Sequence, residues 1–345
     1  MILEELSNAI GVSGEEDDVR AIILAAIRDR AADIQVDALG NLTATQTGTE
    51  YPDYKVMIAA HMDEIGMMVT SVDGGGLIQF TNVGGIDPRI LPGLRVKIGV
   101  KRTSGVVLWK PIHMWRDMNT IAIESLRIDV GVNDKSAAEP GDRIAFDGRY
   151  QQLSDTVVRG KAFDDRVGCA ILVDILRGGP YPVTVCAAFT VQEEIGLRGA
   201  QVAAQRLGPD AAIVLEGTPA YDVPNPNLEA EAGDLPTNPA TRLGEGAVLT
   251  LVDGRMISDP RVMAFLKETA AANDILYQVK TVGGGGTDGG AIHTAQTGVP
   301  TMTLSVPCRY IHSPTALLNL DDYGHVRALS QAVLNRITPA TFKRD

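Results

Sequence analysis

The chain has 345 residues, and its 31 Lys and Arg against 43 Asp and Glu give a formal net charge of −12 at pH 7. Because contacts to phosphates need clustered Lys and Arg, this charge argues against a protein that binds nucleic acid or an anionic membrane surface. The length predicts about two domains, and 45% hydrophobic with 21% charged residues is typical of a globular chain.

The N-terminal part predicts two helices followed by strands. Ser13 and Glu16 match the S-x-x-E pattern of a capping box, and residues 19–27 repeat apolar side chains with a helical period. Residues 34–45 predict a hairpin with Gly-Asn chemistry at its bend. Residues 56–60 form a short apolar run, which is typical of a strand buried on both faces.

From about residue 68 to 158 the pattern changes to short runs rich in β-branched residues, separated by Gly, Pro and Asp. No long helical period interrupts these runs. Several short strands at this spacing predict a small β-barrel or sandwich.

After residue 160, helical periods alternate with short apolar runs, which predicts an α/β domain: a mostly parallel sheet with helices on both faces. The sequence therefore predicts that the β-rich block, residues 68–158, is a small β-barrel domain inserted into an α/β domain of residues 1–67 and 159–345. The predicted strands after residue 160 are 183–191, 211–215, 276–282 and 301–306, and the predicted helices are 167–176, 197–207, 260–272 and 322–337.

No segment predicts export or a membrane span. The N-terminus turns acidic at once, unlike the basic start of a signal peptide, and no apolar stretch approaches 18 residues. Cys169, Cys186 and Cys308 lie in apolar runs, which predicts buried thiols in a reducing compartment. We therefore expect a cytoplasmic protein with no membrane partner.

Histidines and carboxylates follow the predicted buried strands at the points where those strands end. Because open α/β sheets bind ligands beyond the carboxyl ends of their strands, we expect these side chains to share one edge of the sheet. They are His61, Asp63, Glu193, Glu194, Glu216 and His312.

Two pairs of residues suit metal chemistry, and each also has a plain structural explanation. In an extended backbone Asp63 can hold one ring nitrogen of His61 and leave the other for a metal, although a surface histidine beside an acid is the alternative. Glu193 and Glu194 leave a strand in different directions, so one could bind a metal while the other handles a proton. They could equally cap the helix that begins near Gly196.

Asp164 and Asp165 precede a predicted helix, where an aspartate is ordinarily a cap. A carboxylate shared between two cations would also fit there, because its two oxygens can each bind one ion. His293 lies in a predicted helix and is more simply structural, and the sequence assigns no role to His113.

The glycine run at residues 283–290 contains G-x-G-x-x-G between a predicted strand and a helix. A dinucleotide-binding fingerprint also carries an acidic residue about 20 positions later, but position 309 is Arg. A close approach of the backbone to the site or its substrate explains these glycines better.

With these residues together, the sequence resembles the M42 family of metallo-aminopeptidases, the glutamyl/leucyl aminopeptidases that form large tetrahedral particles. Five motifs carry the resemblance, occur in the family's order and span nearly the whole chain. They are AAHMDEIG (59–66), GKAFDDRVG (160–168), VQEEIGLRG (191–199), GTDGGAIH (286–293) and CRYIHS (308–313).

The resemblance implies two divalent metal ions per subunit, Zn²⁺ or Co²⁺, with Asp164 as the carboxylate between them. Glu193 is then the general base and acid that activates a metal-bridged water, and Asp63 orients a histidine ligand. The family often has a cis peptide after the bridging aspartate, here between Asp164 and Asp165. The remaining implied ligands are His61 and Glu216 for one ion and Glu194 and His312 for the other.

The implied activity is removal of the N-terminal residue from short peptides. The α/β domain would be catalytic, and residues 68–158 would form a dimerisation domain through which dimers assemble into a dodecamer. This chain departs from the family at Glu216, where many members have Asp. The departure bears on the implied activity, because related two-metal exopeptidases that act at the amino end and at the carboxyl end of a peptide differ in this choice between Asp and Glu. A metal-dependent hydrolase of another class, deacylase or carboxypeptidase-like, and a non-enzymatic assembled scaffold therefore stay open as alternatives.

Overall fold

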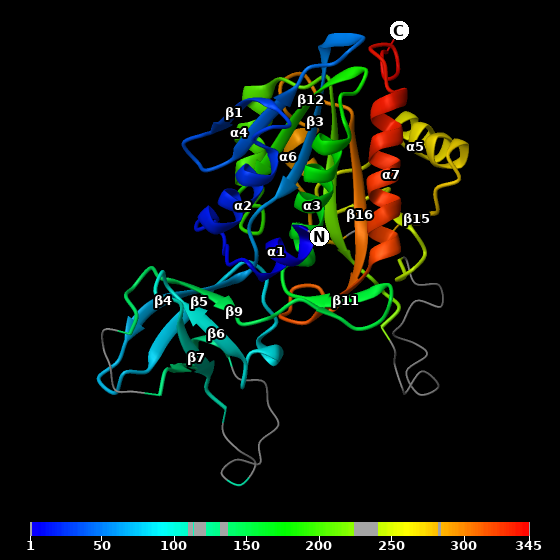
Figure 1. The fold of residues 1–345 in the computed structure, drawn as a ribbon. Coiled ribbons are helices and arrows are strands. Elements are labelled where there is room, and N and C mark those ends of the chain that lie inside the picture. The colour runs from blue at the N-terminus through cyan, green and yellow to red at the C-terminus, as the bar shows by residue number, and fades with distance from the viewer. Residues whose placement is uncertain are drawn as a thin grey trace, which may run out of the picture.

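Two bodies of β-structure organise the molecule: a long sheet in the upper part of Figure 1 and a small barrel below it. The computed structural model describes residues 2–109, 113, 122–131, 137–223, 241–281 and 284–344. Within these residues the sheet has eleven strands and the closed barrel six.

The predicted fold class is confirmed, because the middle of the sheet is parallel and helices cover both of its faces. The four central strands run parallel in the order β12-β3-β13-β16, and antiparallel strands flank them. The full path is β1 (Ala32–Val36), β2 (Leu42–Gln46), β12 (Val183–Thr190), β3 (Tyr51–His61), β13 (Ala211–Pro219), β16 (Thr301–Arg309), β17 (Ala316–Asn319), β11 (Val157–Gly160) and β10 (Gln151–Gln152), with β14 (Ala247–Thr250) pairing β16 and β15 (Tyr277–Lys280).

Strand β3 shows why both faces of the sheet need helices. Val56 and Ile58 belong to the large core that includes α3, whereas Met57 and Ala59 belong to a second core with α4 and α6. All four side chains are fully buried. Since successive residues of a strand point to opposite faces, the continuous apolar run at residues 56–60 is what a doubly covered strand requires.

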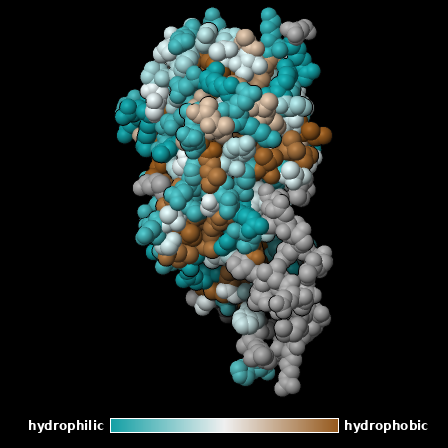
Figure 2. All heavy atoms as spheres, turned by 90° about the vertical axis from the view of Figure 1, so that its right-hand side faces the viewer, coloured by the Kyte–Doolittle hydropathy of each residue, from teal (hydrophilic) through white to brown (hydrophobic). Residues whose placement is uncertain are grey.

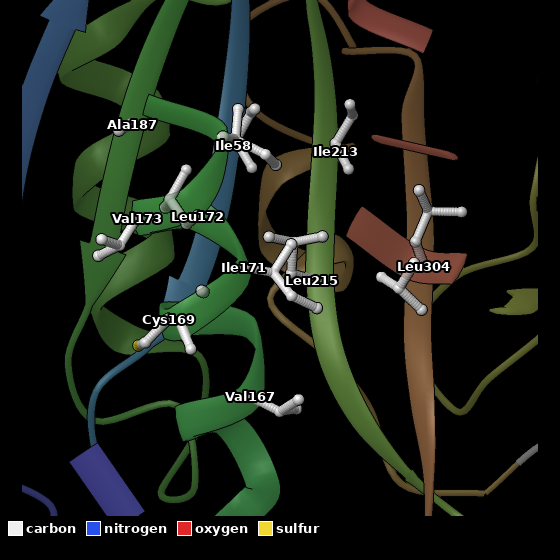
Figure 3. Packing of buried hydrophobic residues seen from close by; sticks show 14 of the residues in the cluster. Ile58, Val167, Cys169, Ile171, Leu172, Val173, Ala187, Ile213, Leu215 and Leu304 are labelled. Carbon is white, nitrogen blue, oxygen red and sulfur yellow. The ribbon is translucent and has the colours of Figure 1, made fainter. Parts of the chain in front are cut away.

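The long helix α3 packs along the central strands on one face of the sheet. Figure 3 shows its Ile171 beside Leu215 of β13, with Leu304 on the neighbouring strand β16. Helices α1, α2 and α7 contact α3, α5 contacts α7, and α4 and α6 lie on the opposite face. The helices are α1 (Ile2–Asn8), α2 (Asp17–Ile27), α3 (Phe163–Gly178), α4 (Arg198–Leu207), α5 (Pro260–Ala272), α6 (Gly289–Ile292) and α7 (Leu320–Arg336).

The barrel has its own apolar core, separate from that of the sheet. Its strands run from Gly66 to Phe146, whereas β10 and β11 at the end of the predicted insertion join the main sheet. The domain limits of 68 and 158 stay a prediction. The barrel closes in the order β4 (Gly66–Val72), β5 (Ile78–Val83), β8 (Ile128–Asp129), β7 (Thr103–Val107), β6 (Arg95–Ile98) and β9 (Arg143–Phe146).

The predicted capping box in front of α2 is wrong. Ser13 Oγ donates instead to Asp63 Oδ2 at 2.6 Å, and Glu16 Oε1 accepts from the backbone N–H groups of Gly14 at 2.6 Å and Gln192 at 3.3 Å. Both side chains are buried, and α2 begins at Asp17 with no side-chain cap. A distant carboxylate has therefore taken the Ser13 hydroxyl away from the helix end, and the Glu16 carboxylate connects the turn before α2 to the distant Gln192.

Four strands of the main sheet, β10, β11, β14 and β17, were not predicted. Each has only two to four residues, which is too short to show a period of two. The predicted strand 276–282 is observed as 277–280, and its last residue lies outside the described part of the chain.

Within the described residues, no helix combines the length and the apolar character needed to cross a membrane. On the face drawn in Figure 2, hydrophobic residues form separate patches among hydrophilic ones.

A buried ion cluster ties the N-terminal segment to β3 and α3. Lys161 Nζ lies 2.7 and 2.8 Å from the two carboxylate oxygens of Glu64, and Arg166 Nη2 lies 3.3 Å from Glu64 Oε1. Arg166 also donates to the carbonyl oxygens of Leu6 at 2.6 Å and Met62 at 2.8 Å. All three charged side chains are at most 2% exposed.

We predict that Glu64→Gln lowers the free energy of unfolding by about 3–5 kcal/mol, because two buried cations lose the one carboxylate that pairs with them among the described residues. Urea unfolding at fixed protein and metal concentration measures the change. Glu50→Gln, at an exposed position, is the matched control and should change the free energy by less than about 0.5 kcal/mol. A loss no larger than that of the control would contradict the role given to Glu64.

Candidate metal centre and active site

All seven side chains that the sequence predicts for the site lie together. Parallel central strands bring their carboxyl ends to one edge of the sheet, and the residues occupy the end of β3, the start of α3, the turn after β12, strand β13 and the turn after β16. They are His61, Asp63, Asp164, Glu193, Glu194, Glu216 and His312.

Asp164 lies between two groups of possible metal ligands. Its Oδ1 is 3.1 Å from His61 Nε2, and its Oδ2 is 3.3 Å from His312 Nε2. His61 Nε2 also lies 3.6 Å from Glu216 Oε2, and His312 Nε2 lies 3.4 Å from Glu194 Oε1. Each oxygen of Asp164 therefore faces one histidine and, beside it, one glutamate.

These donor atoms fit divalent cations. Two ligands bound about 2.0–2.1 Å from a tetrahedral zinc ion lie about 3.3 Å apart, which is the spacing found within both groups. Glu216 Oε1 is buried and has no hydrogen-bond partner among the described residues. Because a buried carboxylate oxygen without a partner is costly, the cluster suits bound cations better than a self-contained polar network.

Asp165 also lies close to His61 and Glu216, with potential ligand atoms of the three within 4.8 Å of one another. However, its Oδ2 accepts from the backbone N–H of His61 at 3.1 Å and its Oδ1 from that of Gly168 at 2.9 Å. Both oxygens are therefore engaged in holding backbone, which favours Asp164 as the shared ligand. The peptide bond between Asp164 and Asp165 is cis, as the family resemblance implies.

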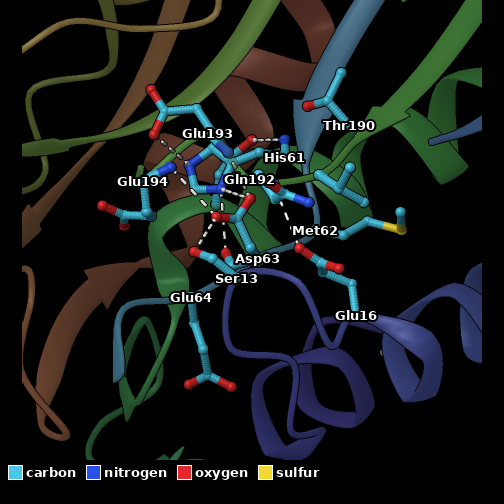
Figure 4. A network of polar contacts seen from close by, with 12 residues as sticks. Ser13, Glu16, His61, Met62, Asp63, Glu64, Thr190, Gln192, Glu193 and Glu194 are labelled. Atoms are coloured by element: carbon cyan, nitrogen blue, oxygen red, sulfur yellow. Dashed lines mark hydrogen bonds and ion pairs between the residues drawn. The ribbon is translucent and has the colours of Figure 1, made fainter. Parts of the chain in front are cut away.

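Asp63 is the centre of the polar network in Figure 4. Its carboxylate accepts from Ser13 Oγ at 2.6 Å and from the backbone N–H groups of Glu193 at 3.0 Å and Glu194 at 3.2 Å. The same carboxylate lies 3.5 Å from His61 Nδ1, and the Asp63 carbonyl oxygen lies closer, at 3.1 Å. Asp63 thus orients the ring of His61 and the turn that carries both glutamates.

Burial sets the protonation of the glutamates. It raises the pKa of Glu216 to about 8 and that of Glu194 to about 7, and it holds the pKa of Glu193 well above its ordinary value. Burial would lower the pKa of His312, but its contacts with Asp164 and Glu194 raise it to about 9. Because a bound cation stabilises the ionised carboxylates and neutral imidazoles, metal binding would release protons from this cluster.

The cluster opens into a cavity of about 610 Å³. Its volume lies in the range of sites that bind small ligands. Gly284–Gly286 line it, and a Cβ atom on Gly286 would lie only 2.6 Å from Cγ of Arg255, so close packing accounts for a glycine there. Residue 283 of the glycine run lies outside the described residues.

Ser13, Gly85 and Asp288 were not predicted at the site. The Gly85 carbonyl, from the loop after β5, accepts from His312 Nδ1 at 3.0 Å. Asp288 is buried, and its Oδ2 accepts from Thr190 Oγ1 at 2.5 Å. The hydrogen-bonded pairs Ser13–Asp63, Gly85–His312 and Thr190–Asp288 are 50, 227 and 98 positions apart in the sequence, and no local pattern reveals such pairings.

Two further histidines considered from the sequence, His113 and His293, lie outside the cluster. His293 Nδ1 donates to the carbonyl oxygen of Gly289 at 2.8 Å, one turn earlier, which agrees with a structural role. His113 is exposed.

Residues 40–329 match the family model described as M42 glutamyl aminopeptidase. The chain belongs to the M42 peptidase family. It is 34% identical to a putative aminopeptidase of Acetivibrio thermocellus, covering 96% of this chain and 97% of the relative. It is 30% identical to the lysyl aminopeptidase of Pyrococcus furiosus, covering 99% of this chain and 98% of the relative.

Solved structures of TET peptidases share the fold of this M42 chain. The TET aminopeptidase of a marine-sediment Thaumarchaeota archaeon superimposes with a TM-score of 0.90 at 32% identity, covering 99% of this chain and 97% of that one. The TET1 peptidase of Pyrococcus horikoshii has a TM-score of 0.84 at 31% identity, covering 97% of this chain and 98% of that one. That peptidase can assemble into a tetrahedron or a large octahedral shell.

We predict that Ser13→Ala weakens zinc binding by about 10-fold, because Asp63 loses a hydrogen bond that fixes its orientation beside His61. Competition with a chromogenic chelator measures the affinity. Ser330→Ala, which removes a buried hydroxyl bonded within α7, should leave the affinity unchanged. Equal affinities of wild type and Ser13→Ala would show that Asp63 is held without the serine.

Proposed function

We propose that this M42 protein is a two-metal aminopeptidase that removes the N-terminal residue from short peptides. The observation that supports it most is the position of Asp164, whose two oxygens each face a separate histidine and glutamate. The names of the matching family and relatives support the aminopeptidase direction, in which a free α-amine is recognised.

In this proposal Asp164 holds both cations, and the other ligands are His61 with Glu216 and His312 with Glu194. Two bound divalent ions, Zn²⁺ or Co²⁺, would supply a water of lowered pKa and polarise the scissile carbonyl.

Glu193 is the proposed general base and acid. It lines the cavity, is only 9% exposed, and has an Oε2 atom 4.0 Å from His61 Nε2. It therefore stands next to one metal position without belonging to the closest donor group. Its raised pKa suits a carboxylate that accepts a proton from the attacking water and passes it to the leaving amine near neutral pH.

Hydrolysis of aminoacyl p-nitroanilides tests the function. The metal-loaded protein should cleave several of them, lose that activity with a chelator, and regain it with Zn²⁺ or Co²⁺. N-acetylated anilides lack the free amine and should stay intact. Cleavage of N-acyl amino acids or of C-terminal residues instead would favour the deacylase or carboxypeptidase-like alternative, and activity that survives complete metal removal would contradict the two-metal proposal.

We predict that Glu193→Gln lowers kcat at least about 100-fold while zinc is still bound, because the amide cannot accept a proton. Steady-state kinetics and metal content per subunit are measured together. Glu245→Gln, at an exposed position away from the site, should behave as wild type. Substantial turnover by Glu193→Gln would assign the proton transfer to another group.

The protein is further proposed to act as a homo-oligomer in which dimers assemble into a dodecamer through the inserted domain, residues 68–158. Three large apolar side chains on or next to barrel strand β7 support an interface there: Val106 is 43%, Leu108 36% and Trp109 64% exposed. They line a shallow cavity of about 830 Å³. A cytoplasmic location stays part of the proposal.

We predict that Trp109→Glu shifts the protein from large particles towards smaller species, because a charge placed in an apolar interface loses its hydration. Sedimentation velocity over a range of protein concentrations measures the distribution. Leu24→Glu alters an exposed leucine of α2 and should leave it unchanged. A wild-type protein that sediments as a monomer at every concentration would refute assembly itself.

A further inference from the structure

The cavity contains a buried lysine for which the proposed mechanism has no use. Lys280, the last residue of β15, lines the same cavity as Asp164 and Glu216 and is only 6% exposed. Its Nζ donates to Thr218 Oγ1 at 2.9 Å. Among the described residues, no carboxylate oxygen lies within 4.0 Å of this ammonium group.

Asp253 is the acidic residue with the largest electrostatic effect on Lys280, but it is engaged elsewhere. Its Oδ1 accepts from the backbone N–H groups of Arg255 and Met256, both at 2.7 Å, and its Oδ2 accepts from Thr287 Oγ1 at 3.3 Å. The Asp253 carboxylate therefore stabilises its own turn and forms no ion pair with Lys280.

A buried ammonium group with one hydroxyl partner is an incomplete arrangement. Lysine offers three N–H donors, and an ion removed from water is costly unless it is paired and hydrogen-bonded. Burial accordingly lowers the pKa of Lys280 from its ordinary value. An anion inside the cavity would supply both the missing charge and acceptors for the free N–H groups.

The lysine lies at the right place to contact a substrate whose first peptide bond is at the metal centre. Glu216 and Thr218 are two residues apart on β13, so they share a face and are separated by about 7 Å along the strand. Lys280 Nζ donates a hydrogen bond to Thr218, the residue of this pair that lies further from the candidate metal ligands. The hydroxyl-bearing side chains of Thr250 and Ser305 line the same cavity, and the register of β14 and β15 places Thr250 directly beside Lys280.

We propose that Lys280 binds a carboxylate of the substrate, and that the side chain of an N-terminal Glu or Asp supplies it. This inference rests on the proposed aminopeptidase function and names its substrate class. Family membership does not decide the class, since the family description prints glutamyl and one relative's name prints lysyl. Lys280 is thus assigned as a specificity-determining residue.

The test compares L-glutamyl and L-glutaminyl p-nitroanilides, which differ in charge and scarcely in shape. Wild type should have a kcat/KM about 10- to 100-fold higher for the glutamyl substrate, the range expected for a charged hydrogen bond. Lys280→Met should bring the ratio to one or below with the glutaminyl rate retained, and Lys280→Glu should favour lysyl over glutamyl anilide. Thr218→Val, which removes only the hydroxyl partner of Lys280, should lower the ratio less than Lys280→Met.

A wild-type ratio near one, or a Lys280→Met variant that slows both substrates equally, would overturn the proposal. A second arm tests the other source of a carboxylate, the C-terminus of a short peptide. If Lys280→Met reduces the preference for glutaminyl-alanine over its C-terminal amide and leaves the glutamyl ratio intact, the assignment to the N-terminal side chain is wrong.

A binding measurement that needs no catalysis tests the role of Lys280 separately from the proposed aminopeptidase function. Calorimetry on the metal-loaded protein should give L-glutamate at least about 10-fold tighter binding than L-glutamine, and Lys280→Met should abolish the difference. If no anilide is cleaved, the aminopeptidase function fails while this measurement still decides the role of Lys280. Equal affinity of wild type for the two amino acids would refute it.

Discussion

The gathering of acidic side chains at one edge of the sheet is the constraint on which the rest of the structure depends. Asp164, Glu194 and Glu216 approach two imidazoles in a buried site, where burial, together with the negative charge of Asp164, raises the pKa of each glutamate to near neutrality or above. Like charges at this density repel one another unless protons or cations intervene. The neighbouring structure therefore has to hold these groups in place against their repulsion, and the contacts around Asp63 do so.

Asp63 connects three separate parts of the chain. It accepts from Ser13 in the N-terminal segment and from the backbone of Glu193 and Glu194 after β12, and it contacts His61 at the end of β3. The N-terminal segment is in turn fastened by the ion cluster of Glu64, whose lysine and arginine partners donate to carbonyl oxygens of residues 6 to 11. The N-terminal segment is thus part of the support of the site rather than a peripheral extension.

Strand ends were the feature of the sequence that could be used to predict the site. The apolar runs at 56–60, 183–191 and 211–215 are long enough to reveal buried parallel strands, and parallel strands bring the residues that follow them to one edge. The bridging role proposed for Asp164 came from family resemblance, because a pair of aspartates before a helix is equally well explained as a cap.

Local patterns failed where a tertiary contact competed with them. Ser13 and Glu16 fit a capping box, but Ser13 binds the distant Asp63, Glu16 accepts from Gly14 and from the distant Gln192, and neither side chain caps α2. Lys280 is a similar case: a lysine at the end of a half-buried strand has no feature that predicts an ammonium in a cavity without a carboxylate partner in the described part of the chain. Its position follows only from the pairing of β14 with β15 and β16, and β14 was itself too short to predict.

The barrel, finally, takes part in building the site. His312 adopts a φ of +57°, which is unfavourable for a residue with a side chain, and its Nδ1 donates to the carbonyl oxygen of Gly85 in the loop after β5. This hydrogen bond fixes the proton on Nδ1 and leaves Nε2 free to face Asp164 and Glu194. Because the loop that orients His312 belongs to the barrel, any displacement of the barrel against the sheet would move a candidate metal ligand. The proposed assembly through the barrel would therefore be physically coupled to the geometry of the candidate metal centre through His312.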